Sequence, residues 1–348
     1  MNPVLVNRWR GNAIECRHRG SVVVAESGGR VLMSLGDARQ QVFPRSAIKF
    51  LQAIPFAESG AMERFGLDER HLAFACASHN GEPVHVELAR EWLDRIGLSH
   101  DDLECGAELP MHQATAFELM NEARGPERVH HNCSGKHLGM LSTALARHES
   151  TRRYRLYNHS VQQRWFEVLG TLGGTRVTEL PWGYDGCGIP ALCLPLQRVA
   201  VAMARFGDPA RFDGARRESI ERVHAALSAH PYLVAGRERV DTALMERLAP
   251  DVFVKVGAEG VFTAVLPGAG QGDGPGGALG IALKMDDGRG SAAAVTLGAV
   301  LDRLGLISPE DGRALAEWFT PTVSNSRGEV VGREEPSSVW DGVQPLGG

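Results

Sequence analysis

The sequence predicts an α+β fold in which segments from both ends of the chain form an antiparallel sheet beside a mainly helical middle region. Short apolar runs with strand character gather near the two termini, whereas the middle third shows helical spacing. Strands and helices therefore do not alternate, which argues against a doubly wound parallel sheet. No glycine-rich phosphate loop follows a strand, so we expect no nucleotide cofactor.

The first third contains a predicted hairpin and two predicted helices. Apolar runs at 21–25 and 30–34 are separated by a short Ser-Gly-Gly segment, which is typical of a β-hairpin. Pro44 precedes apolar residues at helical spacing, which predicts a helix over 45–58 that begins where proline is tolerated. After a polar loop at 78–83, a further helix is expected over 84–96.

The middle of the chain is predicted to be helical, and strands return near its end. We expect helices at these places: from Ser134 onward, 156–171, 190–205, 215–229, 240–248 and 291–304. We expect strands over 252–256, 260–265 and 279–283. The segment 267–277 is rich in Gly and Pro and predicts a long hairpin loop. One domain is expected over 1–332, with its helical region at about 84–250, followed by an irregular tail over 333–348.

Composition narrows the class of protein. The formal net charge is −5, and binding to nucleic acid needs a basic face, so we expect no nucleic-acid partner. The N-terminus lacks a secretory apolar segment and no apolar run reaches transmembrane length, so we expect no membrane partner and a cytoplasmic location. Thiols stay reduced there, so the six cysteines do not indicate a disulfide framework.

Lysine is scarce, and its positions point to chemistry. Only four lysines occur among 37 Lys and Arg residues: Lys49, Lys136, Lys255 and Lys284. A buried lysine can lose its proton and act as a base, nucleophile or ligand, whereas a guanidinium stays charged. The first three lie in motif-like settings and mark a candidate site, while Lys284 reads as an ordinary charge at a strand end.

The first motif is Ser46-x-x-Lys49 at the start of the predicted helix. The i, i+3 spacing places both side chains on one face, and a desolvated lysine there can accept the serine proton. Alone the motif is weak, because a serine at the start of a helix followed by a solvent-exposed lysine has the same sequence pattern.

Two further motifs strengthen the first. Ser78-x-Asn80 lies in a polar loop and, alone, reads as a turn. Lys255-x-Gly257 lies on a predicted strand, where the lysine either needs a buried partner or protects a sheet edge. Together the motifs follow the order found in serine penicillin-recognising enzymes.

Two cysteines lie in glycine-containing turns before predicted helices. Cys133 and Cys187 are candidate thiolate ligands for zinc, and spacing alone adds His137 or Asp185 as further ligands. Two unrelated small hydrophobic residues would give the same pattern. A third interpretation makes Cys133 a nucleophile; its base would be one of three histidines, His130, His131 or His137.

The motifs together resemble the rhizobial-type (class 3) L-asparaginases, also called the asparaginase II family, over about residues 4–330. The segments that carry the resemblance are 44–49 (PRSAIK), 76–83 (CASHNGEP), 132–137 (NCSGKH), 185–188 (DGCG), 230–232 (HPY) and 255–260 (KVGAEG). The resemblance implies a β-lactamase/transpeptidase-like fold, a homodimer, and hydrolysis of L-asparagine to L-aspartate and ammonia. It also implies two serine–lysine pairs, Ser46 with Lys49 and Ser78 with Lys255.

The resemblance further implies a zinc ion bound by Cys133, Lys136 and Cys187, in place of the ligands suggested by spacing. A lysine ligand must be neutral to donate its lone pair. His137 and Asp185 then become groups that support the ligands or contact substrate. The residues expected to bind substrate are Arg45, His79, Asn80, His137 and Asp185, with Arg45 facing the substrate carboxylate.

The expected mechanism is attack by Ser46 on the side-chain amide, with Lys49 as base, backbone N–H groups at the helix start holding the oxyanion, and a covalent acyl-enzyme. Ser78 and Lys255 would relay protons or activate water, and zinc would aid substrate binding. Two other readings are a serine β-lactamase or DD-peptidase relative, and a non-catalytic binding protein stabilised by zinc.

Overall fold

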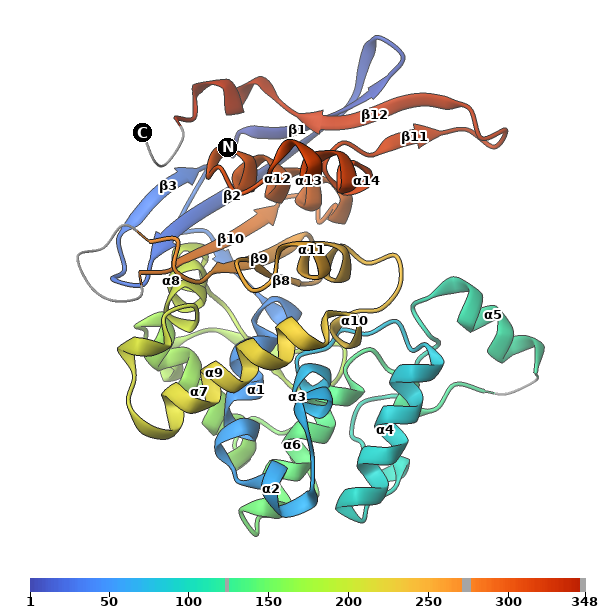
Figure 1. The fold of residues 1–348 in the computed structure, drawn as a ribbon, viewed down its shortest axis with the longest axis vertical. Helices are drawn as coiled ribbons and strands as arrows, with labels where there is room; N and C mark the ends of the chain where they lie inside the picture. The colour runs from blue at the N-terminus through green and yellow to red at the C-terminus, as the bar shows by residue number, and fades with distance from the viewer. Residues whose placement is uncertain (123–124, 271–276, 345–348) are drawn as a thin grey trace.

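The computed structural model describes residues 1–122, 125–270 and 277–344. Within them, an antiparallel sheet runs in the order β11-β12-β1-β2-β10-β9-β8, with β3 also paired to β2 (Figure 1). Its strands are β1 (Val4–Arg10), β2 (Ala13–Glu26), β3 (Val31–Leu35), β8 (Phe253–Val256), β9 (Val261–Leu266), β10 (Leu279–Met285), β11 (Thr322–Ser324) and β12 (Val330–Pro336). Two further sheets of two strands each pair β4 (Gln41–Val42) with β7 (Leu194–Pro195) and β5 (Trp182–Tyr184) with β6 (Pro190–Leu192).

The helices form two groups, one on each side of the sheet (Figure 1). The larger group contains α1 (Lys49–Glu58), α2 (Ala61–Phe65), α3 (Glu69–Ala75), α4 (Pro83–Ile96), α5 (Gln113–Asn121), α6 (Ser134–Ala146), α7 (Ser160–Gly173), α8 (Leu196–Phe206), α9 (Gly214–Ala229) and α10 (Pro231–Val234). Nearer the sheet's other face are α11 (Val240–Leu248), α12 (Gly290–Arg303), α13 (Pro309–Ala314) and α14 (Ala316–Phe319). Short 3₁₀ turns are η1 (Arg45–Ile48), η2 (His100–Asp102), η3 (Arg128–His130), η4 (Val177–Glu179), η5 (Pro209–Arg211) and η6 (Ser338–Gly342).

The long strand β2 separates two hydrophobic cores. Val23 and Ala25 pack with the larger helical group, whereas Val22 and Val24 pack with residues of α12 such as Leu297. Side chains alternate between the two faces of a strand, so a continuous apolar run is what a strand covered on both faces requires. Each fully buried aliphatic side chain contributes about 1.5–3 kcal/mol to stability.

The predicted α+β architecture is confirmed. Strands from the first 35 residues pair with strands from the last hundred, as in the pairing of Val23 with Ala282 across β2 and β10. The predicted hairpin is the β2–β3 pair, and the helix predicted over 45–58 is η1 followed by α1. No helix in the described part of the chain is long and apolar enough to cross a membrane.

The predicted start of one helix was wrong. The helix predicted over 190–205 begins only at Leu196, because Pro190 and Pro195 lie in strands β6 and β7. Proline removes a backbone donor and clashes with the preceding turn, so both would have interrupted the longer helix. The segment 271–276 of the predicted Gly- and Pro-rich loop lies outside the described residues.

The tail predicted to be irregular from 333 onward belongs to the sheet as far as Pro336. In β12, Glu334 lies opposite Arg8 of β1. Beyond the strand, Trp340 is only 2% exposed and donates a hydrogen bond of 3.0 Å from Nε1 to the carbonyl of Leu5. The error arose because the alternation of polar and apolar residues in β12 is weak. Residues 345–348 lie outside the described part of the chain.

Candidate active site

One cavity of about 260 Å³ lies where the end of β8 faces η1 and the start of α6. This volume falls below the roughly 300–1,000 Å³ typical of pockets for drug-sized ligands, so it suits a small metabolite. Six residues predicted from the sequence line it: Arg45, Ser46, Ser78, Cys133, Asp185 and Cys187. They come from segments more than 130 residues apart, so the fold assembles the predicted site.

Ser46 reaches the cavity on a strained turn. The preceding residue, Arg45, has a φ of 49°, a left-handed conformation that a side chain with a Cβ rarely adopts. Such strain persists only where surrounding structure enforces it, and it gathers at functional sites. Close packing enforces it here, since a Cβ at Gly257 would lie 2.9 Å from the carbonyl oxygen of Pro44. The glycine of the Lys-x-Gly motif therefore lets β8 approach the serine turn.

Lys49 lies fully buried beneath the cavity. Its Nζ donates hydrogen bonds to Ser78 Oγ at 2.9 Å and to the carbonyl of Ala77, and it lies 3.2 Å from Cys133 Sγ. Burial lowers the pKa of Lys49 to about 8; the charge of Cys133 opposes this shift, and the nearby ammonium groups of Lys136 and Lys255 add to it. With its lowered pKa and its bond to Ser78 Oγ, Lys49 can act as a proton acceptor.

The serine–lysine contacts differ from those implied by the resemblance. Lys49 binds the hydroxyl of Ser78, and within the described residues the side chain of Ser46 makes no hydrogen bond. Lys255 is bonded to Asp241, at 3.1 Å between Nζ and Oδ1, and not to Ser78. The two predicted pairs are therefore corrected to Lys49 with Ser78 and Lys255 with Asp241.

Lys255 and Asp241 form a fully buried ion pair. Asp241 Oδ1 also accepts a hydrogen bond of 2.8 Å from the amide of Val256, which ties α11 to β8. Burial lowers the pKa of Lys255, against the raising effect of the Asp241 charge. For Asp241, burial acts to raise the pKa, but the charges of Lys255 and Arg239 dominate and lower it. Because Lys255 is fully buried and ion-paired, the alternative interpretation, an exposed charge that protects a sheet edge, does not apply.

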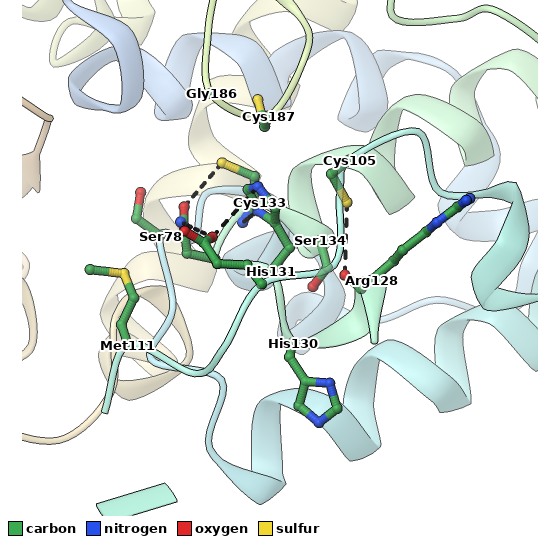
Figure 2. A network of polar contacts seen from close by, with 12 residues as sticks. Ser78, Cys105, Met111, Arg128, His130, His131, Cys133, Ser134, Gly186 and Cys187 are labelled. Atoms are coloured by element: carbon green, nitrogen blue, oxygen red, sulfur yellow. Dashed lines mark hydrogen bonds and ion pairs between the residues drawn. The ribbon is translucent and has the colours of Figure 1, made fainter. Parts of the chain in front are cut away.

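The two predicted thiols and Lys136 meet at the wall of the cavity. Lys136 Nζ lies 3.1 Å from Cys187 Sγ, and Cys187 is hydrogen-bonded to Cys133. Figure 2 shows Cys187 on a separate loop beside Cys133. The bond from Cys187 lowers the pKa of Cys133, helped by Lys136 and Lys49, and the same bond with burial raises the pKa of Cys187. Burial opposes ionisation of Lys136, but the sulfur charges raise its pKa.

These three groups have the donor chemistry of a zinc site. Within the described residues, no group of three His, Cys, Asp or Glu side chains is arranged to hold a metal ion, so a zinc site here requires Lys136 as its third ligand. Cys187 is in contact with both Lys136 and Cys133, and two sulfurs with one nitrogen suit zinc. Cys133 and Cys187 also line the cavity, which leaves a side open. The residues therefore fit the ion implied by the resemblance.

Three of the expected substrate contacts lie behind the cavity wall. His79 accepts a hydrogen bond from the Gly81 amide at Nδ1, so its Nε2 carries the proton and donates to Ser134 Oγ at 2.8 Å. Asn80 and His137 are buried too, and His137 Nδ1 bonds the hydroxyl of Tyr154 at 2.6 Å. The structure thus corrects their role from contacting substrate to holding the loop of Ser78 and the start of α6.

Arg45 and Asp185 do line the cavity, but as a pair. Arg45 Nε donates to Asp185 Oδ1 at 2.7 Å, and the Gly186 amide bonds the same oxygen at 2.7 Å. Glu259 lies 3.9 Å from the Arg45 guanidinium. The second oxygen of Asp185 accepts no hydrogen bond within the described residues, so it is the one available to a ligand.

The sequence profile of the L-asparaginase II family matches residues 6–336. This chain belongs to the L-asparaginase II family. The match covers nearly the whole chain and confirms the family that the motifs predicted, and with it an amidohydrolase. A comparison with curated proteins finds no match.

Solved structures similar to this L-asparaginase II chain are distant. A Bacillus glutaminase solved in the presence of 4.3 M NaCl is 13% identical, with a TM-score of 0.42, over 82% of this chain and 91% of that one. The protein Mglu in its native form is also 13% identical, with a TM-score of 0.41, over 90% of this chain and 71% of its own. Likenesses this distant carry no argument about activity.

Three cavity residues of this family member were not predicted from the sequence: Glu108, Met111 and Arg239. Glu108 and Met111 come from a segment without a motif, and Met111 lies at the rim near Ser78 in Figure 2. Arg239 follows the His-Pro-Tyr motif by seven residues, in a chain with many arginines. No spacing distinguishes it, and only the folded position of α11 brings it to the cavity.

Proposed function

We propose that the protein hydrolyses the side-chain amide of L-asparagine to L-aspartate and ammonia. One observation carries the proposal: a buried lysine, Lys49, bonds the Ser78 hydroxyl under a small cavity that also contains Ser46. An amine in this setting can accept a hydroxyl proton without a histidine. Membership of the L-asparaginase II family supports amide hydrolysis as the reaction.

Ser46 Oγ is the proposed nucleophile. It attacks the side-chain carbonyl carbon, and its proton passes through the Ser78 hydroxyl to Lys49 Nζ. The carbon–nitrogen bond then breaks as the Lys49 ammonium returns the proton to the departing ammonia. Water hydrolyses the resulting aspartyl ester by the same route in reverse, which regenerates Ser46.

Two backbone amides support Ser46 as the attacking residue. The N–H groups of Ser46 and Ala258 donate no hydrogen bond within the described residues, and both residues line the cavity. Two free donors beside a nucleophile can stabilise the negative oxygen of the tetrahedral intermediate, and one such donor is typically worth about 10²–10³ in rate. The amide of Ser78, by contrast, is already bonded to the carbonyl of Val234.

Asp185 is the proposed partner of the substrate α-ammonium group. Its free carboxylate oxygen faces a cavity that accommodates an amino acid, and Arg45 with the Gly186 amide fixes the other oxygen. In this account Arg45 orients Asp185, and the predicted role of Arg45 as the carboxylate partner becomes indirect.

Zinc is proposed as a resident ion held by Cys133, Lys136 and Cys187. When bound, it supplies a positive charge that attracts a substrate oxygen and favours binding. Lys136 must lose its proton to become a ligand, and the metal replaces that proton. The contact between Lys136 Nζ and Cys187 Sγ seen here is the one expected without the metal, when Lys136 keeps its proton and its charge is balanced by sulfur.

The proposal is tested by measuring ammonia release from L-asparagine and from L-glutamine with wild type and with Ser46→Ala. We expect turnover of asparagine by wild type and near-complete loss in the variant. Hydrolysis of a chromogenic β-lactam would instead favour the penicillin-recognising reading, and bound zinc without amidase activity would favour a binding protein. The homodimer and the cytoplasmic location remain predictions.

A further inference from the structure

A second arginine, Arg239, lines the cavity, and some of its N–H donors make no hydrogen bond within the described residues. Its NH1 donates hydrogen bonds of 3.0 Å to the carbonyl of Ser78 and 3.0 Å to Asn80 Oδ1. A guanidinium has five N–H donors, so these two bonds use both hydrogens of NH1 and leave three on NH2 and Nε. Within the described residues NH2 faces only Asp241 Oδ2, at 3.8 Å, which is beyond hydrogen-bond distance.

Surrounding groups hold this guanidinium in place. Asn80, which accepts from Arg239, is itself fixed by bonds from its Nδ2 to Glu82 Oε1 at 3.1 Å and to the carbonyl of Arg237 at 2.7 Å. The Arg239 side chain is 17% exposed, so most of it is packed while part still meets the cavity. A guanidinium that is already held in place before the ligand binds loses little side-chain entropy on binding.

Charge at the cavity makes a carboxylate the fitting ligand group. Arg45, the other arginine lining the cavity, already has its Nε bonded to Asp185. Lys49 and Lys255 lie fully buried beneath the wall and are bonded to protein acceptors. Among the described residues that line the cavity, Arg239 is therefore the arginine whose guanidinium has no hydrogen bond to a carboxylate. Its planar N–H pairs match carboxylate geometry.

We propose that Arg239 binds the α-carboxylate of the substrate and so restricts the enzyme to amides that carry one. The proposal rests on the proposed asparaginase function. It places the carboxylate at the Ser78 and Arg239 side of the cavity and the ammonium at Asp185. The amide then lies between these anchors, near Ser46.

The test compares Arg239→Gln with a matched control, Arg237→Gln. Arg237 lies two residues away, its side chain is 63% exposed, and it does not line the cavity, so its loss changes net charge equally. Three amides are assayed for ammonia release: L-asparagine, succinamic acid, which lacks the ammonium, and β-alaninamide, which lacks the carboxylate. Thermal unfolding of each variant confirms that it is folded.

The expected result is selective. Arg239→Gln should raise KM for asparagine and succinamic acid by about 10- to 100-fold, the usual effect of losing a charge-assisted contact, and should change KM for β-alaninamide by no more than about twofold. Arg239→Lys should recover part of the lost affinity, because lysine restores the positive charge but not the planar pair of N–H donors. Arg237→Gln should resemble wild type. If β-alaninamide is turned over too slowly, its inhibition constant supplies the same comparison.

Two results would overturn the inference. Equal loss on all three amides would mean that Arg239 only supports the Ser78 loop, and carboxylate-selective loss in Arg45→Gln but not in Arg239→Gln would assign the contact to Arg45. If wild type releases no ammonia from any amide, the proposed function fails separately. Calorimetric binding of L-aspartate then decides the inference: Arg239→Gln must weaken it and Arg237→Gln must not.

Discussion

Lys49 donates its 2.9 Å hydrogen bond to Ser78, the serine that stands 29 residues away, and not to Ser46 in its own motif. The two serines therefore have different surroundings. Ser78 has the proton acceptor, whereas Ser46 has the free backbone amides beside it. In the proposed mechanism, this division makes Ser78 the proton relay and Ser46 the nucleophile, and a single lysine serves both.

Replacing Lys49 tests the proton acceptor. Lys49→Met keeps a similar volume but removes the amine, so kcat for asparagine should fall by about 10²–10⁴, the usual range for a general base. The matched control is Lys284→Met, since Lys284 is half-buried on β10 and, in the described part of the chain, bonds only the carbonyls of Glu259 and Met285. Ammonia release measured for both variants decides the point. Retention of more than a tenth of wild-type kcat by Lys49→Met would show that another group takes the proton.

The buried pair of Asp241 with Lys255 should matter for stability. Removing one member of a buried ion pair leaves an uncompensated charge, at a typical cost of about 3–5 kcal/mol. Asp241→Ala should therefore lower the free energy of unfolding by that amount in a denaturant titration. Asp251→Ala, at an exposed position just beyond α11, should stay within about 0.5 kcal/mol of wild type. Equal effects of the two substitutions would contradict a structural role for the pair.

Metal content tests the zinc proposal without an activity assay. Wild type and Cys193→Ser should each contain about one zinc per chain, because Cys193 is a buried thiol outside the proposed ligand set. Cys187→Ser should contain little, because it removes the thiol that lies 3.1 Å from Lys136 Nζ. Chelation should lower the thermal midpoint of wild type, since an ion that binds only the folded state adds about 4 kcal/mol at a thousandfold excess over Kd. It should also raise KM for asparagine more than it lowers kcat. Full zinc content in Cys187→Ser would remove that thiol from the ligand set.

Acid should destabilise the protein partly through His85. Burial lowers the pKa of His85 from 6.5 to about 4, so the unfolded chain binds the proton first as pH falls. The contribution of neutral His85 to the free energy of unfolding is fully present above pH 6.5 and is lost as the pH falls from 6.5 to 4. Between pH 7 and pH 5 this loss is about 2 kcal/mol. His85→Gln should shrink the difference in unfolding free energy between these pH values by that amount. His100→Gln, at an exposed turn, should leave the difference unchanged.

The sequence revealed the elements of the site better than their contacts. Four lysines and short motifs were enough to predict that Ser46, Ser78, Cys133 and Cys187 meet in one place, because the motif residues need one another chemically. Partners across the fold were not predictable in the same way. The ion pair of Lys255 with Asp241 joins β8 to α11, and neither periodicity nor spacing indicates which acid lies opposite a buried lysine.

Polar residues within motifs were also over-assigned to substrate. His79 and Asn80 stand beside Ser78, yet the turn at Gly81 directs both side chains into the protein, where they bond Ser134 and Glu82. The fold class, by contrast, followed from apolar runs at both ends of the chain, since burial on two faces leaves a clear pattern. The edge strand β11 and its neighbour β12 carried no such pattern and were missed.

The central claim is a serine nucleophile, and its most direct test is the site of the covalent intermediate. The enzyme is mixed with asparagine, quenched in acid within its first turnovers, digested and analysed by mass spectrometry. The account predicts an aspartyl group on the peptide that contains Ser46, absent in Ser46→Ala and increased in a variant that hydrolyses the ester slowly. An aspartyl group on Cys133, or full ammonia release by Ser46→Ala, would contradict it.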